Sequence, residues 1–120
     1  MKISGYMSNC NVKVTFHDLL SKIPYNHNNW YIFEFDAIGI APQNMTMQEF
    51  EDLVLNSEYG YRMGWDELLE LSKTIEDINN LILISSTDFV DFASIENGTA
   101  YSLIIRLEIH DSTYWEIEFY

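Results

Sequence analysis

The three adjacent residues His110, Asp111 and Ser112 contain the side-chain types of a hydrolase triad. We expect no triad from them, because neighbouring residues in a tight turn point in different directions. The other two histidines lie far away in the sequence, and no pair of histidines has the spacing of metal ligands. The sequence also lacks a glycine-rich phosphate loop, a His-Glu-x-x-His motif and a Gly-x-Ser-x-Gly nucleophile elbow. It therefore favours a protein without catalytic residues, a metal or a cofactor.

Negative charge is the chemistry that the sequence does offer. Nineteen Asp and Glu residues stand against six Lys and Arg residues, so the formal net charge is −13 and the pI is near 4.2. Such a surface repels nucleic-acid phosphates and anionic membranes, and it steers basic macromolecules toward itself. We expect a basic protein partner, without direct binding to nucleic acid or to a membrane.

The acidic residues are concentrated between positions 49 and 77, where nine acidic residues accompany two basic ones. Aromatic residues lie among them, and rigid aromatic side chains are frequent anchors of protein interfaces. We predict a partner-binding surface that consists of Glu49, Glu51, Asp52, Glu58, Tyr59, Tyr61, Asp66, Glu67 and Glu70. A second predicted patch consists of Glu108, Glu116 and Glu118. The alternative for the first segment is a solvated helical face whose aromatic side chains turn into the core.

The last twenty residues, which must position the second patch, alternate between apolar and polar residues as a β-hairpin does. A two-residue loop would set Leu107 opposite Glu116, whereas a three-residue loop at 111–113 sets Leu107 opposite Ile117. Only the longer loop keeps one face of the hairpin apolar, so we predict that register. It also places the carboxylates of Glu108 and Glu116 side by side, where they repel each other. A basic partner would relieve this repulsion; the alternative is that both carboxylates lie on an exposed, solvated face of the sheet.

Helices are predicted to carry the first acidic surface. Thr46-Met47-Gln48-Glu49 is a capping box, so a helix is expected over 46–56. Apolar residues at helical spacing predict a second helix over 65–79 and a short one over 16–23. In the 46–56 helix we expect Leu53 to face the core.

The predicted strands cover 30–36, 81–85, 89–92 and the hairpin of 101–120. The pattern also allows the first strand to continue to Pro42 with a bulge at Gly39. Strict alternation in this strand would place Tyr31, Phe33 and Phe35 on one face. We predict an α+β fold, with an antiparallel sheet of about four to six strands, the two longer helices packed on one face and a C-terminal β-hairpin. The expected organisation is a single domain over 1–120.

The expected location is the cytoplasm. Cys10 is the only cysteine, so the sequence shows no sign of an oxidising compartment. The first residues lack the apolar region of a signal peptide, and no apolar run approaches the ~20 residues of a membrane-spanning helix.

Three segments, Trp65–Lys73, Leu81–Ile84 and Ile109–Ile117, resemble small bacterial immunity proteins of polymorphic and contact-dependent growth inhibition toxins. The run Asp-Ser-Thr-Tyr-Trp-Glu-Ile in the last segment is the most suggestive part. The resemblance implies a cytoplasmic, acidic protein that blocks one cognate toxin, frequently a basic nuclease domain. Such proteins have many folds and individual contact surfaces, so the resemblance assigns no site residue.

Three other functions remain open at this point. An acidic nucleic-acid mimic that inhibits a DNA- or RNA-binding protein would use the same charge, and regularly spaced acids on an extended surface would favour it. A small-ligand binder or enzyme would place Glu34, Glu108 and Glu116 in a deep carboxylate pocket. The third alternative is a structural subunit. The clustering of the acids favours one compact basic partner.

Overall fold

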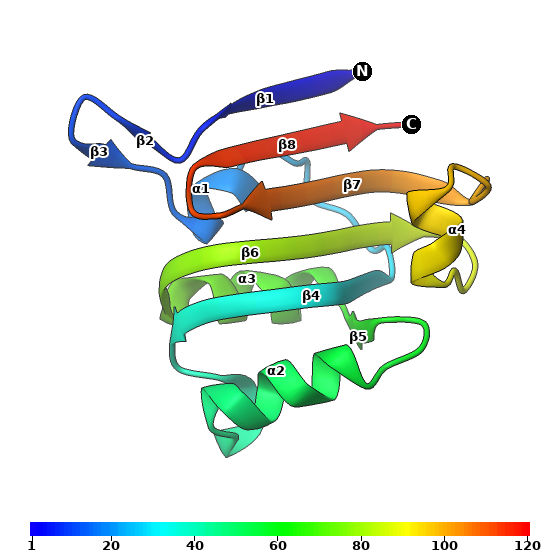
Figure 1. The fold of residues 1–120 in the computed structure, drawn as a ribbon, viewed down its shortest axis with the longest axis horizontal. Helices are drawn as coiled ribbons and strands as arrows, with labels where there is room; N and C mark the ends of the chain where they lie inside the picture. Colours follow the sequence, from blue (N-terminus) through cyan, green and yellow to red (C-terminus); the bar gives the residue numbers. More distant parts are fainter.

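Six antiparallel strands form one sheet in the order β1-β8-β7-β6-β4-β5 (Figure 1). This computed structural model describes residues 1–120, apart from the side chain of Asn9. The strands of the sheet are β1 (Lys2–Tyr6), β4 (Trp30–Gly39), β5 (Tyr61–Met63), β6 (Ile75–Ser86), β7 (Leu103–His110) and β8 (Tyr114–Phe119). A small ribbon of β2 (Ser8–Asn9) and β3 (Val12–Lys13) extends beyond one end of the sheet (Figure 1). The predicted α+β class and antiparallel sheet are confirmed.

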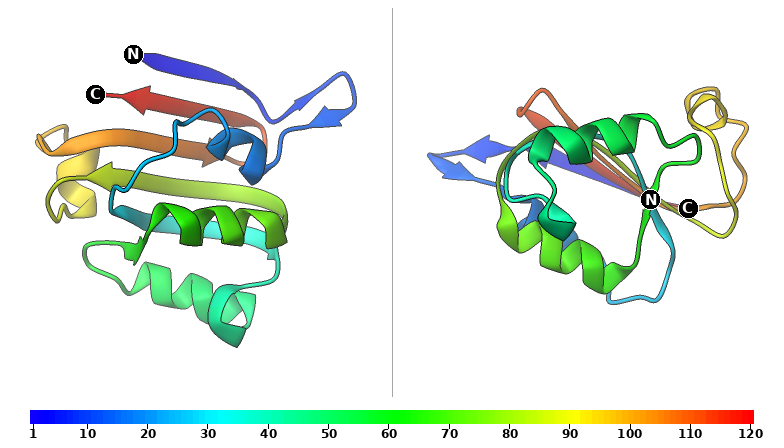
Figure 2. Two further views of the ribbon diagram at one scale, coloured as in Figure 1. Left: turned by 180° about the vertical axis from the view of Figure 1, so that it is seen from behind. Right: turned by 90° about the horizontal axis from the view of Figure 1, so that it is seen from below.

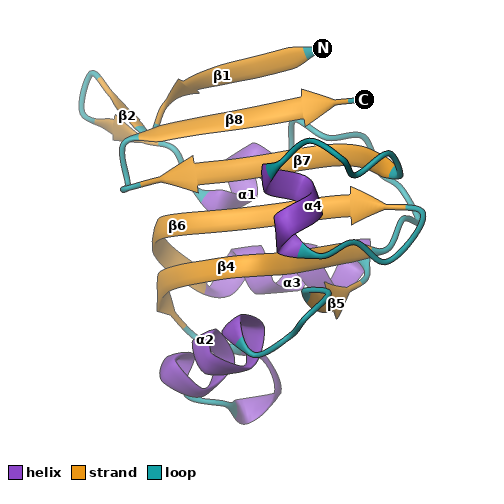
Figure 3. Cartoon of the chain, turned by 45° about the vertical axis from the view of Figure 1, so that its right-hand side comes forward, coloured by secondary structure: helices purple, strands orange, loops and turns teal.

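Helices lie on both faces of this sheet. They are α1 (Phe16–Leu20), the 3-10 turn η1 (Pro42–Asn44), α2 (Met47–Leu55), α3 (Trp65–Thr74) and α4 (Phe92–Glu96). Seen from behind, α1 and α3 cover the sheet (Figure 2), whereas α4 covers the opposite face (Figure 3). Helix α2 lies beside β4 at the edge of the sheet (Figure 1). Within the described residues, no helix has the length and apolar character needed to cross a bilayer.

Short-range hydrogen bonds begin the helices where the sequence predicts. The hydroxyl of Thr46 accepts from the backbone N–H of Glu49 at 3.1 Å, and the Glu49 carboxylate accepts from the Thr46 N–H at 2.9 Å. Thr15 and Asp18 form the same reciprocal cap at the start of α1. Both capping interactions satisfy N–H groups that have no partner inside the helix.

The larger core lies between the sheet and the helices α1, α2 and α3. The Trp30 and Trp65 rings lie 5.3 Å apart within it, and Trp30 donates from Nε1 to the side chain of Asn26 at 2.9 Å. On the face that α4 covers, a smaller core consists of Tyr31, Phe33, Ile82, Ile84, Val90 and Ile95. The central strands are therefore buried on both sides.

A bulge in β4 determines which of its side chains enter which core. Ile32 pairs with Leu83 and Glu34 pairs with Ile82, so Phe33 is an extra residue without an opposite partner. The expectation that Phe33 and Phe35 share a face is consequently wrong. Phe33 packs in the smaller core, whereas Phe35 joins Ile32 in the larger one, because an inserted residue reverses the alternation.

The prediction of one helix over 65–79 is wrong at its C-terminal end. Helix α3 stops at Thr74, and Ile75 already pairs with Gly39 in the sheet. The Thr74 hydroxyl lies 2.7 Å from the Ile40 carbonyl and 2.9 Å from the Leu71 carbonyl and shares its one proton between them, which ties the helix end to the residue that follows β4. Pairing with β4 outweighs the helical spacing of the apolar residues after Thr74.

Two further local expectations are also wrong. Residues 89–92 do not form a strand, because Asp91 accepts a hydrogen bond from the Ser94 N–H at 2.8 Å and caps the helix α4. Leu53 is exposed rather than buried, so only Phe50 and Val54 of α2 are fully in the core.

The C-terminal hairpin has the predicted register. Leu107 pairs with Ile117, and His110 pairs with Tyr114 across the three-residue loop. The loop is also held to β6, because the backbone N–H of Asp111 donates to Asn80 at 3.1 Å. The predicted bulge at Gly39 is present as well.

Gly39→Ala is expected to lower the free energy of unfolding by about 3 kcal/mol, because it combines backbone strain with overpacking. Gly39 has φ +150°, and an added Cβ would lie 2.3 Å from the Thr74 carbonyl oxygen. Chemical denaturation measures the change. Gly98→Ala is the matched control, since Gly98 has φ +75° but no atom within 4 Å of the added Cβ. It is expected to lose only about 1 kcal/mol, and equal losses would contradict the packing around Gly39.

Candidate functional site

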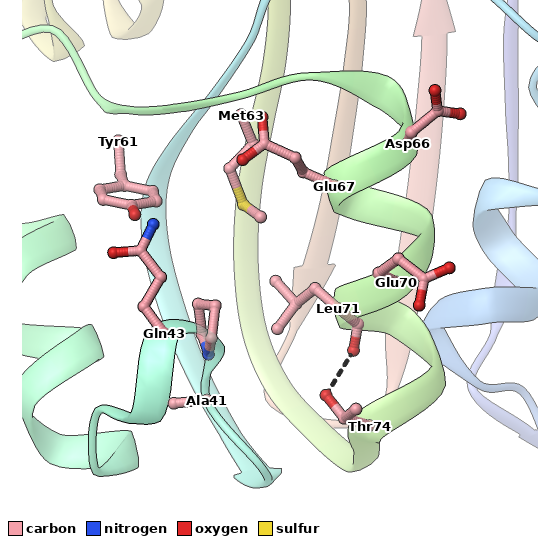
Figure 4. Close-up of a pocket in the computed structure, with 10 residues that line it drawn as sticks. Ala41, Gln43, Tyr61, Met63, Asp66, Glu67, Glu70, Leu71 and Thr74 are labelled. Atoms are coloured by element: carbon pink, nitrogen blue, oxygen red, sulfur yellow. Dashed lines mark hydrogen bonds between the residues drawn. The ribbon is translucent and has the colours of Figure 1, made fainter.

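An open pocket of about 430 Å³ lies between α3 and the η1 segment (Figure 4). We call it the α3 pocket. Its apolar part consists of Ala41, Pro42, Tyr61, Met63 and Leu71, and its acidic rim consists of Asp66, Glu67 and Glu70. The Glu67 side chain reaches toward the hollow, whereas the carboxylates of Asp66 and Glu70 point away from it (Figure 4). Four of the residues predicted to bind a partner, Tyr61 and the three acids of the rim, therefore meet at one hollow.

The spacing along α3 brings the rim together. Positions 66, 67, 70, 71 and 74 fall on one side of a helix, and all of them line the pocket. The opposite wall approaches because the Ile40 N–H donates to the Thr74 carbonyl at 2.9 Å. This contact places the η1 segment next to the end of α3.

The acids of the rim are exposed and differ in their partners. Glu67 accepts a hydrogen bond from the Gly64 N–H at 2.9 Å and so caps the N-terminus of α3. Glu70 lies 3.1 Å from the ammonium group of Lys73, an exposed pair that holds its geometry weakly. Asp66 has only a 3.4 Å contact with the hydroxyl of Tyr25. Asp66 and Glu70 can therefore turn toward a cation on a partner.

The composition of the α3 pocket suits one kind of guest. Lys and Arg side chains bury their aliphatic stems on apolar surface and keep the charged group at a polar boundary. An apolar floor below a carboxylate rim has that arrangement. The pocket thus fits a basic side chain of another protein.

The structure disperses the rest of the first predicted surface. Glu49 serves the cap of α2, and the hydrogen bond from the Thr46 backbone holds the pKa of Glu49 below its ordinary value. Glu51 accepts from the Ala37 N–H at 3.1 Å, beside a bulge of β4, and Asp52 accepts from Gln48 at 2.9 Å. Three of the predicted acids on α2 therefore support local structure. The last two residues of the first predicted surface, Glu58 and Tyr59, are exposed in the connection between α2 and β5.

The second predicted patch also differs from the expectation. Glu108 is only 6% exposed, so the prediction that its sheet face is open is wrong. Arg106 donates from Nη2 to Glu108 at 3.0 Å, while its Nε lies 3.0 Å from the other carboxylate oxygen. Burial alone lowers the pKa of Arg106, but the hydrogen bond and charge of Glu108 raise it above its ordinary value. Glu118 lies opposite Arg106 and contacts the Tyr120 hydroxyl at 3.4 Å.

Glu108, His110 and Glu116 have ligand atoms within 4.8 Å of one another, a grouping that could hold a divalent metal. Two cations already face its carboxylates. Arg106 holds Glu108, and Lys2 lies 3.8 Å from Glu116. These ion pairs neutralise the charge that would attract a metal ion. The three side chains are therefore better explained as part of the ion pairs between neighbouring strands than as a metal site.

Comparisons of this chain with protein-family models, with curated proteins and with solved structures found no match. The geometry and charge of the chain must therefore carry any assignment of function.

Sequence reasoning missed the floor of the α3 pocket. Met63 and Leu71 are visible in the sequence only as ordinary core residues, and nothing in the run 41–43 indicates that it approaches α3. That approach results from the pairing of β4 with β6, which joins segments more than thirty positions apart.

Arg106→Met is expected to lower the free energy of unfolding by about 2 kcal/mol, because it leaves the Glu108 carboxylate buried without its cation. Chemical denaturation of the variant measures this loss. The double variant Arg106→Met, Glu108→Leu is the control, since it removes both charges together. We expect it to recover at least half of the loss, and a double variant as unstable as the sum of both single changes would contradict the pairing.

Proposed function

We propose that this protein is an immunity-type inhibitor that binds and neutralises a basic toxin domain in the cytoplasm. The observation that carries the proposal is the α3 pocket, in which Glu67 reaches over an apolar floor and the exposed side chains of Asp66 and Glu70 lie beside it on the same helix. The proposed inhibition is stoichiometric and needs no catalytic residue or cofactor.

The charge of the molecule supports a basic toxin as the target. A nuclease toxin must hold nucleic acid, so its active site is a cationic cleft. An inhibitor that presents carboxylates to this cleft replaces the phosphates of the substrate. Close charge pairs across such interfaces are worth roughly 1.5 to 7 kcal/mol, and a net charge of −13 accelerates the encounter.

The resemblance to immunity proteins supports the same assignment. Its first segment, Trp65–Lys73, is almost the whole of α3 and supplies every acid of the pocket rim. Three of the predicted acids lie together on one helix beside one hollow, which favours a compact partner over mimicry of a nucleic-acid backbone.

The first experiment is capture of partners from the source cells on immobilised protein, with washes at ~0.1 M and ~1 M salt, because screening lengths fall from about 10 to 3 Å between them. A small basic domain retained at high salt is then expressed alone and together with this chain. The proposal expects that the domain arrests growth and that co-expression restores growth. A captured domain whose toxicity or activity is unchanged by this chain would contradict the function.

Glu70→Lys is expected to slow association with that domain by about fivefold at low salt, because a two-unit charge change at the pocket rim weakens electrostatic steering. Stopped-flow mixing measures the rate. Glu76→Lys is the matched control, because Glu76 is exposed and lies outside the pocket lining. Equal slowing by both variants would show that overall charge, and not the α3 pocket, drives association.

A further inference from the structure

Four large side chains are exposed together on the side of the sheet that α4 covers. They are Leu55, Tyr59, Phe89 and Phe92, which are 70, 45, 69 and 42% exposed. We call them the aromatic patch. It combines residues from the end of α2, from the connection before β5, from the connection between β6 and α4 and from the start of α4. Helix α3, which lines the α3 pocket, lies on the opposite face of the sheet (Figure 3).

The rings of the patch are held in place by packing. Phe89 lies 6.0 Å from the buried ring of Tyr31 and 5.8 Å from Tyr59. Phe92 lies 6.3 Å from the buried ring of Phe33. Each exposed phenylalanine therefore rests on a side chain of β4, so ordering these rings upon binding costs little conformational entropy.

A hollow of about 330 Å³ opens within this patch. Phe33 forms its base, Leu55 and Phe92 form apolar walls, and Glu34 and Glu58 supply carboxylates. Contiguous exposed apolar surface with a polar rim is typical of protein interaction sites. The hollow provides space for an apolar side chain of another protein.

Acidic side chains predominate around the patch, and Arg106, the cation that contacts α4, is already paired with Glu96 and Glu108. The patch is built from two stretches, 23–61 and 74–105, and neither contains a Lys or an Arg. The exposed residues Asp88 and Asp91 lie close to Phe89 in the sequence, on either side of it. A second copy of this chain would bring like charges together, whereas a segment with Lys or Arg beside its apolar residues would complement both the rings and the acids.

We propose that the aromatic patch is a second docking surface, which binds an amphipathic segment of a partner protein with apolar side chains flanked by Lys or Arg. The apolar side chains occupy the hollow and cover Phe89, and the basic side chains pair with Glu34, Glu58 and Asp88. This inference goes beyond the inhibitor function, because it does not require the partner to be a toxin or the α3 pocket to be occupied.

The probe is a synthetic amphipathic peptide of Leu and Lys, titrated into the isotope-labelled full chain and followed by NMR. We expect saturable shifts confined to 55–59 and 88–96. One control peptide replaces every Lys by Glu, and another replaces every Leu by Ser. Both controls are expected not to bind, since each removes one half of the complementarity. Absence of saturable Leu–Lys binding by ~1 mM would overturn the proposal, as would shifts centred on α3.

Phe89→Ser and Leu55→Ser are expected to weaken peptide binding by about tenfold each, as loss of an interface anchor does. Both residues are mostly exposed, and unchanged spectra away from the patch verify the fold. Tyr101→Ser is the matched control at an exposed aromatic residue elsewhere. Unchanged affinity of Phe89→Ser would overturn the proposal, and so would patch-dependent self-association of the wild-type chain in place of peptide binding. Glu70→Lys is expected to retain the peptide, so failure of this surface is distinguishable from failure of the α3 pocket.

Discussion

The pairing of β4 with β6 is the constraint on which the rest of the structure depends. Both strands are buried on two faces, and the single extra residue Phe33 decides which β4 side chains enter which core. Ile32 and Phe35 enter the larger core, while Tyr31 and Phe33 enter the smaller core on the face that α4 covers. The same pairing brings the end of β4 to the end of α3 and so creates the α3 pocket.

The surplus of carboxylates is compatible with this fold because several of them satisfy backbone groups. Hydrogen bonds from Thr15 and Thr46 hold the pKa values of Asp18 and Glu49 below their ordinary values, and bonds from Ser94 do the same for Asp91. A depressed folded-state pKa contributes stability above the ordinary pKa of the group, and this contribution is lost as the pH falls. The remaining acids, such as Asp66 and Glu70, are left to act at the surface.

Patterns that depend on neighbouring residues could be predicted from the sequence. The capping box at Thr46 involves residues three positions apart, and the hairpin register follows from keeping Leu107 opposite Ile117. The bulge at Phe33 and the end of α3 at Thr74 could not be predicted, because both depend on pairing between distant strands. The same limit applied to the site. The acids of α3 were visible in the sequence, but the approach of the 41–43 segment and the burial of Glu108 against Arg106 were not.

Hydrogen exchange of this protein, alone and with a basic domain captured on it, tests the central claim most directly. The account predicts that binding slows exchange of backbone amides in α3 and in the β5 segment beside it, where the pocket rim and floor lie. Protection confined to the exposed edge strand β1 and its neighbour β8, with α3 unchanged, would contradict the claim that the α3 pocket receives the partner.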